Sequence, residues 1–590
     1  MSSQGTTGGE QPSASVGGRL SNRPLSWLFA LLLGGTAIFL SSFYAERNLP
    51  FQDEGATLTA AARILRGEVF YRDIDAYPFP GAAYLAAGAM AVFGEHLSVA
   101  RGLAAALFCS WVLALYFVAL RCLGFARAAL FGSALLAWKF LAWPAFSTYM
   151  YSDLAFAAGC GVLACFFVSD RPLGSLRLIG AGLLTAIAVT GKQNLGLYLG
   201  AASLAILMPV ALPWRLPGVT SWRPFWLFGL SAAAPLVGAS LWFASHDVLG
   251  QLLYSGLLRP LTGYLPTSGI DFSPMLAWWE LGSLQGPDAA SYFILDYFQV
   301  LMVGALPWPQ WEGVLWLCGE IFSRGVYTAV TISVVWWWAR IVGIVRERDG
   351  QRAGDGQPAL VLPFGLLALA MLASAFPRAD FFHIISVAPP VLLLLILLGA
   401  RVDAPMRWPR SAIAGVTLLL AVSASLAWVQ RSLLTEHVVL ERADVWVAPE
   451  NVWMESLVKT IRDQVPEGEP FYVYGHEAQL YFLTGRFFSW PFSQLYPGQE
   501  GDDGGQEIVD RLVEAPPLLI VRGRQFWPGM PRAAKYAPRL DRWVRANYGP
   551  DPAPFRLHPL PENVSPPQPQ WMTLLKPRGT PLLSPKSTGG

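Results

Sequence analysis

Long apolar runs constrain this chain more than any other feature of its sequence. A helix needs roughly 20 predominantly apolar residues to cross the hydrocarbon core of a bilayer. Charged residues make up only 14% of the chain, against roughly 25% in soluble domains. The sequence therefore predicts a mainly α-helical, polytopic membrane protein with about eleven transmembrane helices, at residues 26–43, 98–120, 127–143, 153–169, 176–191, 194–211, 225–244, 324–341, 358–376, 382–400 and 411–430.

Arginine and lysine predict the orientation of these helices, because cytoplasmic loops carry an excess of both. If the N-terminus is cytoplasmic, every inside connection is basic, and the densest clusters lie at 340–352 and 401–410. An odd number of spans then places the C-terminal part outside. A variant with thirteen spans and the same final orientation stays open, because Ser291 to Leu306, within a Trp-rich stretch at 245–323, can also dip into or cross the bilayer.

The charged residues are unevenly distributed and divide the chain into a membrane part and a more polar part. Of the 82 charged residues, 35 lie in residues 431–590. There, apolar runs at Phe471–Tyr474 and Leu518–Val521 predict short buried strands, preceded by helices at Val452–Gln464 and Gln506–Glu514. We expect a disordered cytoplasmic tail at residues 1–24 and a transmembrane domain at 25–430, with a first exterior loop at 44–97. A small exterior α/β domain is expected at 431–548, and a Pro-rich flexible tail at 549–590.

Composition also excludes several classes of function. A net charge of +2 gives no reason to expect nucleic acid as a partner. All five cysteines lie in or beside apolar segments, which excludes an exterior domain held by disulfides. The histidines lack metal-ligand spacing, and we find neither a nucleophile motif nor a phosphate loop. The sequence therefore predicts no cofactor and no structural metal, and it leaves open a divalent cation for which it gives no indication.

Ionisable residues gather on the predicted exterior side of the membrane. Such residues are costly at the ends of apolar spans, so each is a candidate for function. The predicted topology places them in the first loop, at the start of the fourth span, between spans five and six, and before span ten: Asp53, Glu54, Asp73, Asp75, Asp153, Lys192, Arg378, Asp380 and His383. The cytoplasmic side offers mostly arginines without paired carboxylates. An active site is therefore expected to face outward.

The first exterior loop is the most informative stretch. Residues 53–66 have apolar side chains at helical spacing, which predicts an amphipathic helix along the membrane surface. Asp53 and Glu54 then lie at its positive N-terminal end, where a carboxylate is favoured. A plain helix cap followed by a first-turn acid is the alternative interpretation of this pair. Asp73 and Asp75, on the following loop segment, are expected to be solvated.

The pattern of this loop resembles the membrane glycosyltransferases of the C-type fold, which include protein mannosyltransferase-like and lipid A aminoarabinose transferase-like enzymes. The matching features are the Asp-Glu pair after the first span, an alanine-rich helix, an aromatic-Pro segment and a later arginine, at Asp53, Glu54, Tyr77, Pro78, Pro80, Gly81, Phe93, Gly94 and Arg101. Weaker matches follow at Thr190 to Lys192 and in YGHEAQLYFLTGR, from Tyr474 to Arg486.

The resemblance implies transfer of a sugar from a polyprenyl-phosphate donor to a glycan, lipid or protein acceptor, with inversion at the anomeric carbon. It implies a multi-pass protein of the bacterial inner membrane that works on its outer face. In that family the Asp of the Asp-Glu pair is the general base, a place that Asp53 holds here. By the same resemblance, Glu54, Tyr77 and Arg101 are expected to contact substrate.

One departure from the family pattern concerns the donor phosphate. Relatives place a lysine before the proline of the first loop, whereas this chain has Tyr77 before Pro78. The phosphate clamp is therefore predicted to be Lys192, as first choice, together with Arg378, and Asp380 and His383 are expected as further substrate contacts. Structural alternatives exist, since a lysine can snorkel to the interface and Arg378 can form an ion pair with Asp380.

Asp153 opens the fourth predicted span, and relatives often have an acid near this point. It is a candidate for orienting the acceptor, and its alternative interpretation is a helix cap. For the whole chain, the competing hypothesis is a transporter or flippase of lipid-linked sugars, although we find no internal repeat. A scaffold that only binds polyprenyl lipids is a third hypothesis.

Overall fold

The structure is a computed structural model, and it describes residues 23–141, 146–169, 171–264, 269–282, 312–347, 358–376, 378–399, 410–495, 499–501, 503–523, 533–550 and 572–579. Ser291 to Leu306 and most of the two predicted tails lie outside the described residues.

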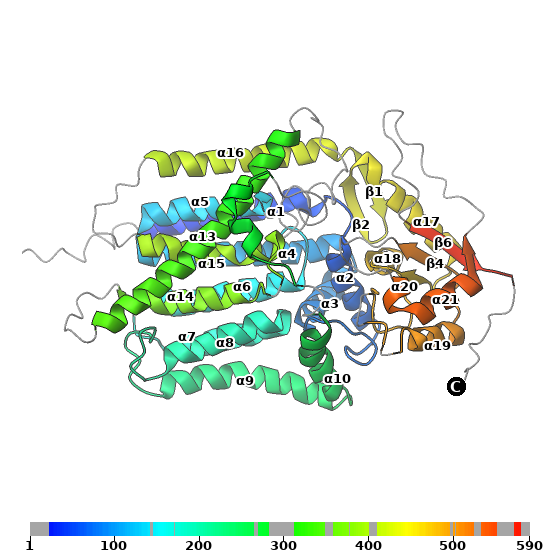
Figure 1. Cartoon of the computed structure of the whole chain (residues 1–590), viewed down its shortest axis with the longest axis horizontal. Helices are drawn as coiled ribbons and strands as arrows, with labels where there is room; N and C mark the ends of the chain where they lie inside the picture. The colour runs from blue at the N-terminus through cyan, green and yellow to red at the C-terminus, as the bar shows by residue number, and fades with distance from the viewer. Residues whose placement is uncertain are drawn as a thin grey trace, which may run out of the picture.

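A bundle of long helices forms one end of the molecule (Figure 1). A helix is present at each of the eleven predicted spans: α1 (Arg23–Ala45), α4 (Leu97–Leu123), α5 (Phe125–Leu141), α6 (Tyr151–Phe167), α7 (Ser175–Gly191), α8 (Gln193–Leu207), α9 (Arg223–Ala244), α13 (Glu312–Glu347), α14 (Pro358–Ala373), α15 (Phe381–Gly399) and α16 (Arg410–Leu433). Within the described residues, six of these helices are long and apolar enough to cross a membrane. The prediction of a mainly α-helical, polytopic protein is confirmed, while the number of spans stays a prediction.

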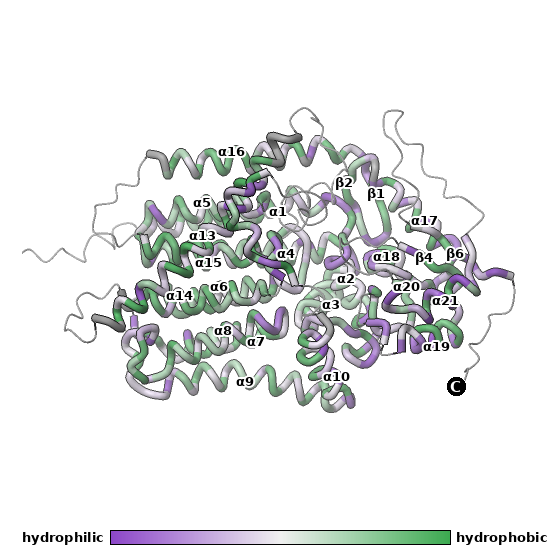
Figure 2. Tube along the Cα trace, in the orientation of Figure 1, coloured by the Kyte–Doolittle hydropathy of each residue, from purple (hydrophilic) through white to green (hydrophobic). Residues whose placement is uncertain are grey.

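The outer helices of the bundle expose apolar side chains, as helices in contact with lipid do. Leu31 of α1, Leu230 of α9 and Leu418 of α16 are each more than three-fifths exposed. Figure 2 shows the contrast between this apolar bundle and the more polar opposite end. The buried side of the bundle is a continuous apolar core that includes Trp111 of α4, Phe156 of α6 and Leu394 of α15.

The predicted first exterior loop folds into two short helices between the bundle and the C-terminal domain (Figure 1). The predicted amphipathic helix is α2 (Gln52–Leu65), and α3 (Gly81–Phe93) follows it. Leu58 and Ala61 of α2 belong to the same apolar core as Leu480 and Phe482 of the C-terminal domain. The helix that carries the Asp-Glu pair, α2, therefore packs against the C-terminal domain.

Between α9 and α13 in the sequence, the described residues form a second group of short elements. It consists of α10 (Leu249–Leu253), two π-helical turns, η2 (Tyr254–Leu258) and η3 (Pro260–Tyr264), and two 3₁₀ turns, η4 (Ser273–Leu276) and η5 (Trp278–Glu280). Arg324 of α13 donates hydrogen bonds to the carbonyl oxygens of Pro274 and Ala277 at 2.9 and 2.7 Å, and Glu320 pairs with it at 2.8 Å. This buried pair fixes the 3₁₀ turns against α13.

The C-terminal domain combines two small sheets with short helices. An antiparallel hairpin of β1 (Glu436–Leu440) and β2 (Ala443–Val447) precedes η8 (Pro449–Asn451) and α17 (Trp453–Gln464). A second sheet has the strand order β3-β4-β6-β5, in which β3 and β4 are parallel. The remaining elements are β3 (Tyr472–Tyr474), α18 (Gln479–Thr484), α19 (Gln506–Glu514), β4 (Ile520–Gly523), α20 (Ala533–Tyr536), α21 (Pro538–Asn547), β5 (Tyr548–Pro550) and β6 (Met572–Pro577).

Both expected strands and their preceding helices are present in this domain, but the expected boundary of the tail is wrong. β6 lies within the segment predicted to be flexible, and it pairs with β4 on one side and with β5 on the other. Leu574 and Leu575 are buried in the sheet. A run of six residues among many prolines gave too weak a local signal, because the strand is defined by its non-local partners.

Candidate active site

A cavity lies where α2, α6, α15 and the junction of α7 with α8 meet. Its interior has about 30 Å³ of room for the centres of water-sized groups, and all the empty space in and around it, including open solvent at its mouth, amounts to about 490 Å³. Phe146, Phe156, Leu195 and Phe382 supply apolar walls. Polar and ionisable side chains from four separate segments of the sequence also line it, and these are Asp53, Tyr151, Ser152, Asp153, Lys192, His383 and Ser386.

Asp53 reaches this cavity from the first turn of α2. Its carboxylate makes no hydrogen bond and no close ion pair within the described part of the chain, although the side chain is half-buried. Burial raises the pKa of Asp53, and the positive charges of Arg378 and His383 oppose that effect only in part. A carboxylate with a raised pKa and open hydrogen-bonding capacity is suited to accept a proton from a bound hydroxyl group.

Lys192 joins α7 to α8 and lines the same cavity. Its backbone is extended between the two helices, and its amide donates to the carbonyl oxygen of Ala188 at 2.9 Å. The ammonium group has no hydrogen bond and no close ion pair to any residue that the structure describes. Burial lowers the pKa of Lys192 to about 8, and the charge of Asp380 opposes the shift. A half-buried ammonium with no close protein partner in the described structure is available to bind an anion.

Asp380 organises the third side of the site. One carboxylate oxygen accepts from the His383 backbone amide at 2.8 Å and lies 2.7 Å from His383 Nδ1. The other accepts from Arg378 Nε at 2.6 Å. Burial alone would raise the pKa of Asp380, but these partners outweigh it and hold the pKa at about 2. Asp380 is therefore a fixed anion that orients His383 toward the cavity.

The ion pair considered as an alternative for Arg378 and Asp380 is thus confirmed. Arg378 still influences the charge state of Asp53 through space. Because one guanidinium edge is held by Asp380, Arg378 acts from the margin of the cavity, and it does not line it. Of the two cations proposed for a phosphate clamp, only Lys192 lines the cavity.

Asp153 faces the cavity and also caps α6, so the alternative interpretation of this residue is confirmed too. Its carboxylate accepts from the Met150 amide at 3.2 Å, and its own amide donates to the Met150 carbonyl at 3.1 Å. The preceding turn is held by Lys139, which donates to the carbonyl oxygen of Phe146. Asp153 therefore has protein partners that Asp53 lacks.

The expectation that Glu54 and Arg101 contact substrate is not supported by their environment. The two side chains form a buried ion pair at 3.0 Å, with 0% and 1% of their surfaces exposed. Glu54 also accepts from the Tyr149 amide at 3.1 Å, and Arg101 donates to the carbonyl oxygens of Ala45 and Arg47. Both groups are fully used in joining α2 to α4 and to the end of α1, because burying either charge requires such a partner.

Asp75 is buried, which corrects the expectation that it is solvated. It receives two hydrogen bonds from Arg259, each 2.9 Å long, and a third from Ser255 at 2.9 Å. The Arg259 guanidinium lies 5.1 Å from the centroid of the Tyr77 ring, so Tyr77 packs on this ion pair and does not line the cavity. Sequence spacing could not show this partner, since Arg259 is distant in the chain and lies between the two π-helical turns η2 and η3.

Among the described residues, no group of three histidine, cysteine, aspartate or glutamate side chains is placed to hold a metal ion. The cavity instead combines a carboxylate, an ammonium group and an imidazole that a second carboxylate orients. Such a set can remove a proton from a nucleophile and stabilise a leaving anion.

Neither a protein-family model nor a curated protein matches the sequence. Among solved structures, the chain is similar to ArnT from Cupriavidus metallidurans bound to undecaprenyl phosphate, with 12% identity, a TM-score of 0.43 and coverage of 94% of this chain and 97% of that one. It is similar to the oligosaccharyltransferase of Archaeoglobus fulgidus in its apo form, with 12% identity, a TM-score of 0.47 and coverage of 84% and 69%.

A third similar structure is the archaeal oligosaccharyltransferase AglB from Archaeoglobus fulgidus in complex with an inhibitory peptide and a dolichol-phosphate, with 11% identity, a TM-score of 0.43 and coverage of 84% and 69%. Each of these TM-scores lies below 0.5.

Proposed function

We propose that the chain is a membrane glycosyltransferase that moves a sugar from a polyprenyl-phosphate donor to a hydroxyl-bearing acceptor on the exterior face, with inversion at the anomeric carbon. Asp53 is the general base of this reaction. Lys192 is the principal clamp for the donor phosphate, while Arg378, Asp380 and His383 support it. The acceptor is a lipid, a polysaccharide or a protein on the outer side of a bacterial inner membrane.

The observation that carries this proposal is that Asp53 and Lys192 line the same cavity. They are the two ionisable side chains of the cavity that have neither a hydrogen bond nor a close ion pair within the described structure, whereas Asp153, Asp380 and His383 are held by protein groups. A single displacement needs one base and one stabilised leaving anion, with no enzyme nucleophile. The motif of the first loop gives independent support, because it resembles that of glycosyltransferases at the same aspartate.

The proposed reaction breaks one bond and forms one. The acceptor hydroxyl loses its proton to the Asp53 carboxylate while its oxygen attacks the anomeric carbon. The bond from that carbon to the phosphate oxygen breaks on the opposite face, and the polyprenyl phosphate leaves with the electron pair. Lys192 stabilises the charge that develops on the phosphate. The proton on Asp53 is then released to solvent through the mouth of the cavity.

The proposal is tested with purified protein, a panel of radiolabelled polyprenyl-phosphate sugars and a membrane extract as the source of acceptor. Label that leaves the lipid and enters a new product would support the proposal. Label that stays on the lipid but crosses the bilayer of proteoliposomes would identify a flippase instead. Donor binding with neither outcome, across the full panel and several extracts, would indicate a lipid-binding scaffold.

Donor binding is expected to weaken at high pH, because the Lys192 ammonium loses its proton near pH 8. The lysine is a cation below its pKa, so phosphate binding is present below about pH 8 and is lost above it. The KM for the donor, measured between pH 6 and pH 10, should therefore rise through this range. Lys192→Gln should raise the KM at all these pH values.

Lys192→Arg is the control for this effect, because arginine keeps its charge throughout the range. It should remove the rise in KM at high pH. An unchanged rise in Lys192→Arg would show that another group is responsible, and it would exclude Lys192 as the clamp.

A further inference from the structure

The helix that carries Asp53 has two opposite faces. Gly55, Thr59 and Arg63 follow one another at intervals of four residues, so they share one side of α2. This side lies against the C-terminal domain. Asp53 precedes Gly55 by two residues and therefore projects about 200° away around the helix axis. Asp53 therefore faces the cavity from one side of α2, while the opposite side of α2 packs against the exterior domain.

The contact at Gly55 is unusually close. A Cβ atom added to Gly55 would lie 2.5 Å from Gln479 Cβ, 2.6 Å from Gln479 Cα and 2.6 Å from Gln479 N. Two of these atoms belong to the backbone of α18, so no side-chain rotation can relieve the overlap. Glycine is therefore required here for the backbones of α2 and α18 to touch.

Hydrogen bonds extend this contact along α2. Thr59 Oγ1 donates to the carbonyl oxygen of Ala478 at 2.9 Å, and Arg63 Nη1 donates to that of Trp490 at 2.8 Å. Gln494 Nε2 donates to the carbonyl oxygen of Gln52 at 3.1 Å. The last bond holds the residue immediately before Asp53. The first turn of α2 is thus fixed by the C-terminal domain on both sides of the proposed base.

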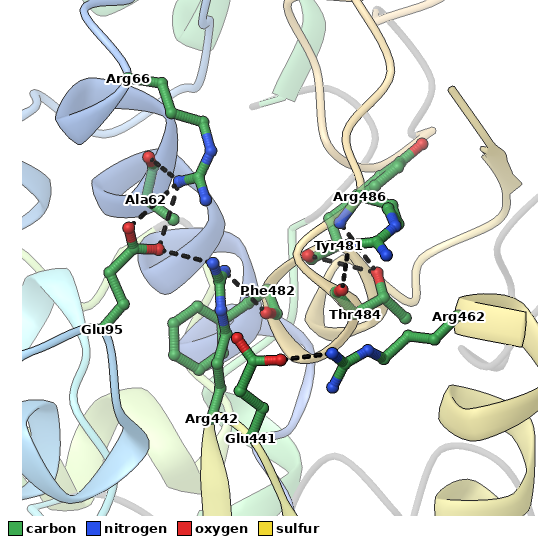
Figure 3. Close-up of polar contacts among 10 residues, drawn as sticks. All are labelled: Ala62, Arg66, Glu95, Glu441, Arg442, Arg462, Tyr481, Phe482, Thr484 and Arg486. Atoms are coloured by element: carbon green, nitrogen blue, oxygen red, sulfur yellow. Dashed lines mark hydrogen bonds and ion pairs between the residues drawn. The ribbon is translucent and has the colours of Figure 1, made fainter. Parts of the chain in front are cut away.

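Helix α18, which contacts α2 through Gln479, is also held by a network of polar contacts at Phe482 (Figure 3). Arg442, in the turn of the β1–β2 hairpin, donates to the carbonyl oxygen of Phe482 in α18 at 3.1 Å and pairs with Glu95 at 2.8 Å. Glu95 also pairs with Arg66, just after α2, at 3.2 Å. This network ties α18 to the end of α2 and to the last residues of the first loop, so it fixes the position of α18 relative to α2.

We infer that the exterior domain positions the proposed base, and that Gly55 is the positioning residue through which α18 fixes Asp53 in the cavity. None of the residues proposed to hold the donor phosphate lies on α2. A shift of α2 should therefore impair proton transfer without weakening donor binding. Misplacement of a reacting group by about 1 Å can lower a rate by roughly 100-fold.

The kinetic test, which rests on the proposed function, compares Gly55→Ala with Gly88→Ala. Gly88 is an exposed glycine inside α3, where an added Cβ meets no atom within 4 Å. Gly55→Ala is expected to lower kcat by roughly 100-fold with an unchanged KM for the donor, and Gly88→Ala to change neither. A rise in donor KM with an unchanged kcat in Gly55→Ala would overturn the inference.

A milder pair of variants covers the case in which Gly55→Ala does not fold. Thr59→Val removes the hydroxyl that donates to Ala478 and keeps the shape of the side chain. Thr59→Ser retains the hydroxyl. The inference predicts a lower kcat for Thr59→Val and a kcat near that of wild type for Thr59→Ser. Equal values in the two variants would contradict the positioning role.

A readout without activity separates this inference from the proposed function. Asp53→Cys is placed in a chain whose five native cysteines are replaced by alanine, and its rate of reaction with a small methanethiosulfonate is measured. Adding Gly55→Ala should change that rate several-fold, whereas Gly88→Ala should not. Equal rates in all three proteins would overturn the inference. Absence of sugar transfer in wild type would instead count against the proposed function, and the thiol rates would still decide the inference.

Discussion

Asp53→Asn should lower kcat for sugar transfer by roughly 10²- to 10⁴-fold, the usual contribution of a general base. The amide has nearly the shape of the carboxylate but cannot accept the proton of the acceptor hydroxyl. Because the Asp53 side chain makes no hydrogen bond with the rest of the described protein, the substitution removes no structural contact. Donor affinity and thermal stability should therefore stay close to those of wild type.

Initial rates at saturating donor, together with equilibrium binding of the labelled donor, give both quantities for this variant. Retention of a tenth or more of the wild-type kcat would exclude Asp53 as the base. A parallel loss of donor binding would assign it a binding role instead. Because burial raises the pKa of Asp53, wild-type kcat should fall as the pH decreases and the carboxylate becomes protonated, and Asp53→Asn should lose this limb of the profile.

Glu54→Gln, the same change one residue later, is expected to act on stability. It leaves the Arg101 guanidinium buried without its carboxylate partner, and breaking a buried ion pair in this way costs about 3–5 kcal/mol. The midpoint of denaturation in detergent micelles should decrease accordingly. Asp53→Asn is the matched control, since it changes a neighbouring carboxylate that has no protein partner.

The double variant Glu54→Gln with Arg101→Met tests the reason for this effect. It removes the unpaired charge, so it should recover part of the stability that Glu54→Gln loses. A stability for Glu54→Gln equal to that of Asp53→Asn would show that the pair does not hold α2 to α4. A strong loss of kcat in Glu54→Gln, with the stability of wild type, would indicate that Glu54 contacts substrate.

Local patterns in the sequence predicted much of the fold. Apolar length alone placed each long helix, because the energetic requirement for burying a backbone in lipid is visible in the residues themselves. The cavity was partly predictable as well. The sequence predicts Asp53 as a site residue from the resemblance of the first loop, and Asp153, Lys192 and His383 as ionisable residues at the ends of apolar spans. The structure brings these four residues to one cavity.

The failures share a physical cause, which is that the partner of a charge is not visible in its sequence neighbours. Glu54 is a carboxylate next to Asp53 in the sequence, but in the structure it forms a buried ion pair with Arg101. The sequence predicts a solvated Asp75, because its partner Arg259 lies far along the chain. The packing of Gly55 on Gln479 likewise depends on a domain more than 400 residues away. These features require the tertiary fold.

The stereochemistry of transfer tests the central claim most directly. A donor of known anomeric configuration would be converted by the wild-type protein, and the configuration of the new glycosidic bond would be read by NMR from the coupling of the anomeric proton. Direct displacement assisted by Asp53 predicts the opposite configuration in the product, which Asp53→Asn should form at least about 100-fold more slowly under the same conditions. A product of retained configuration would require either a double displacement or attack on the face from which the phosphate leaves, and it would contradict the account.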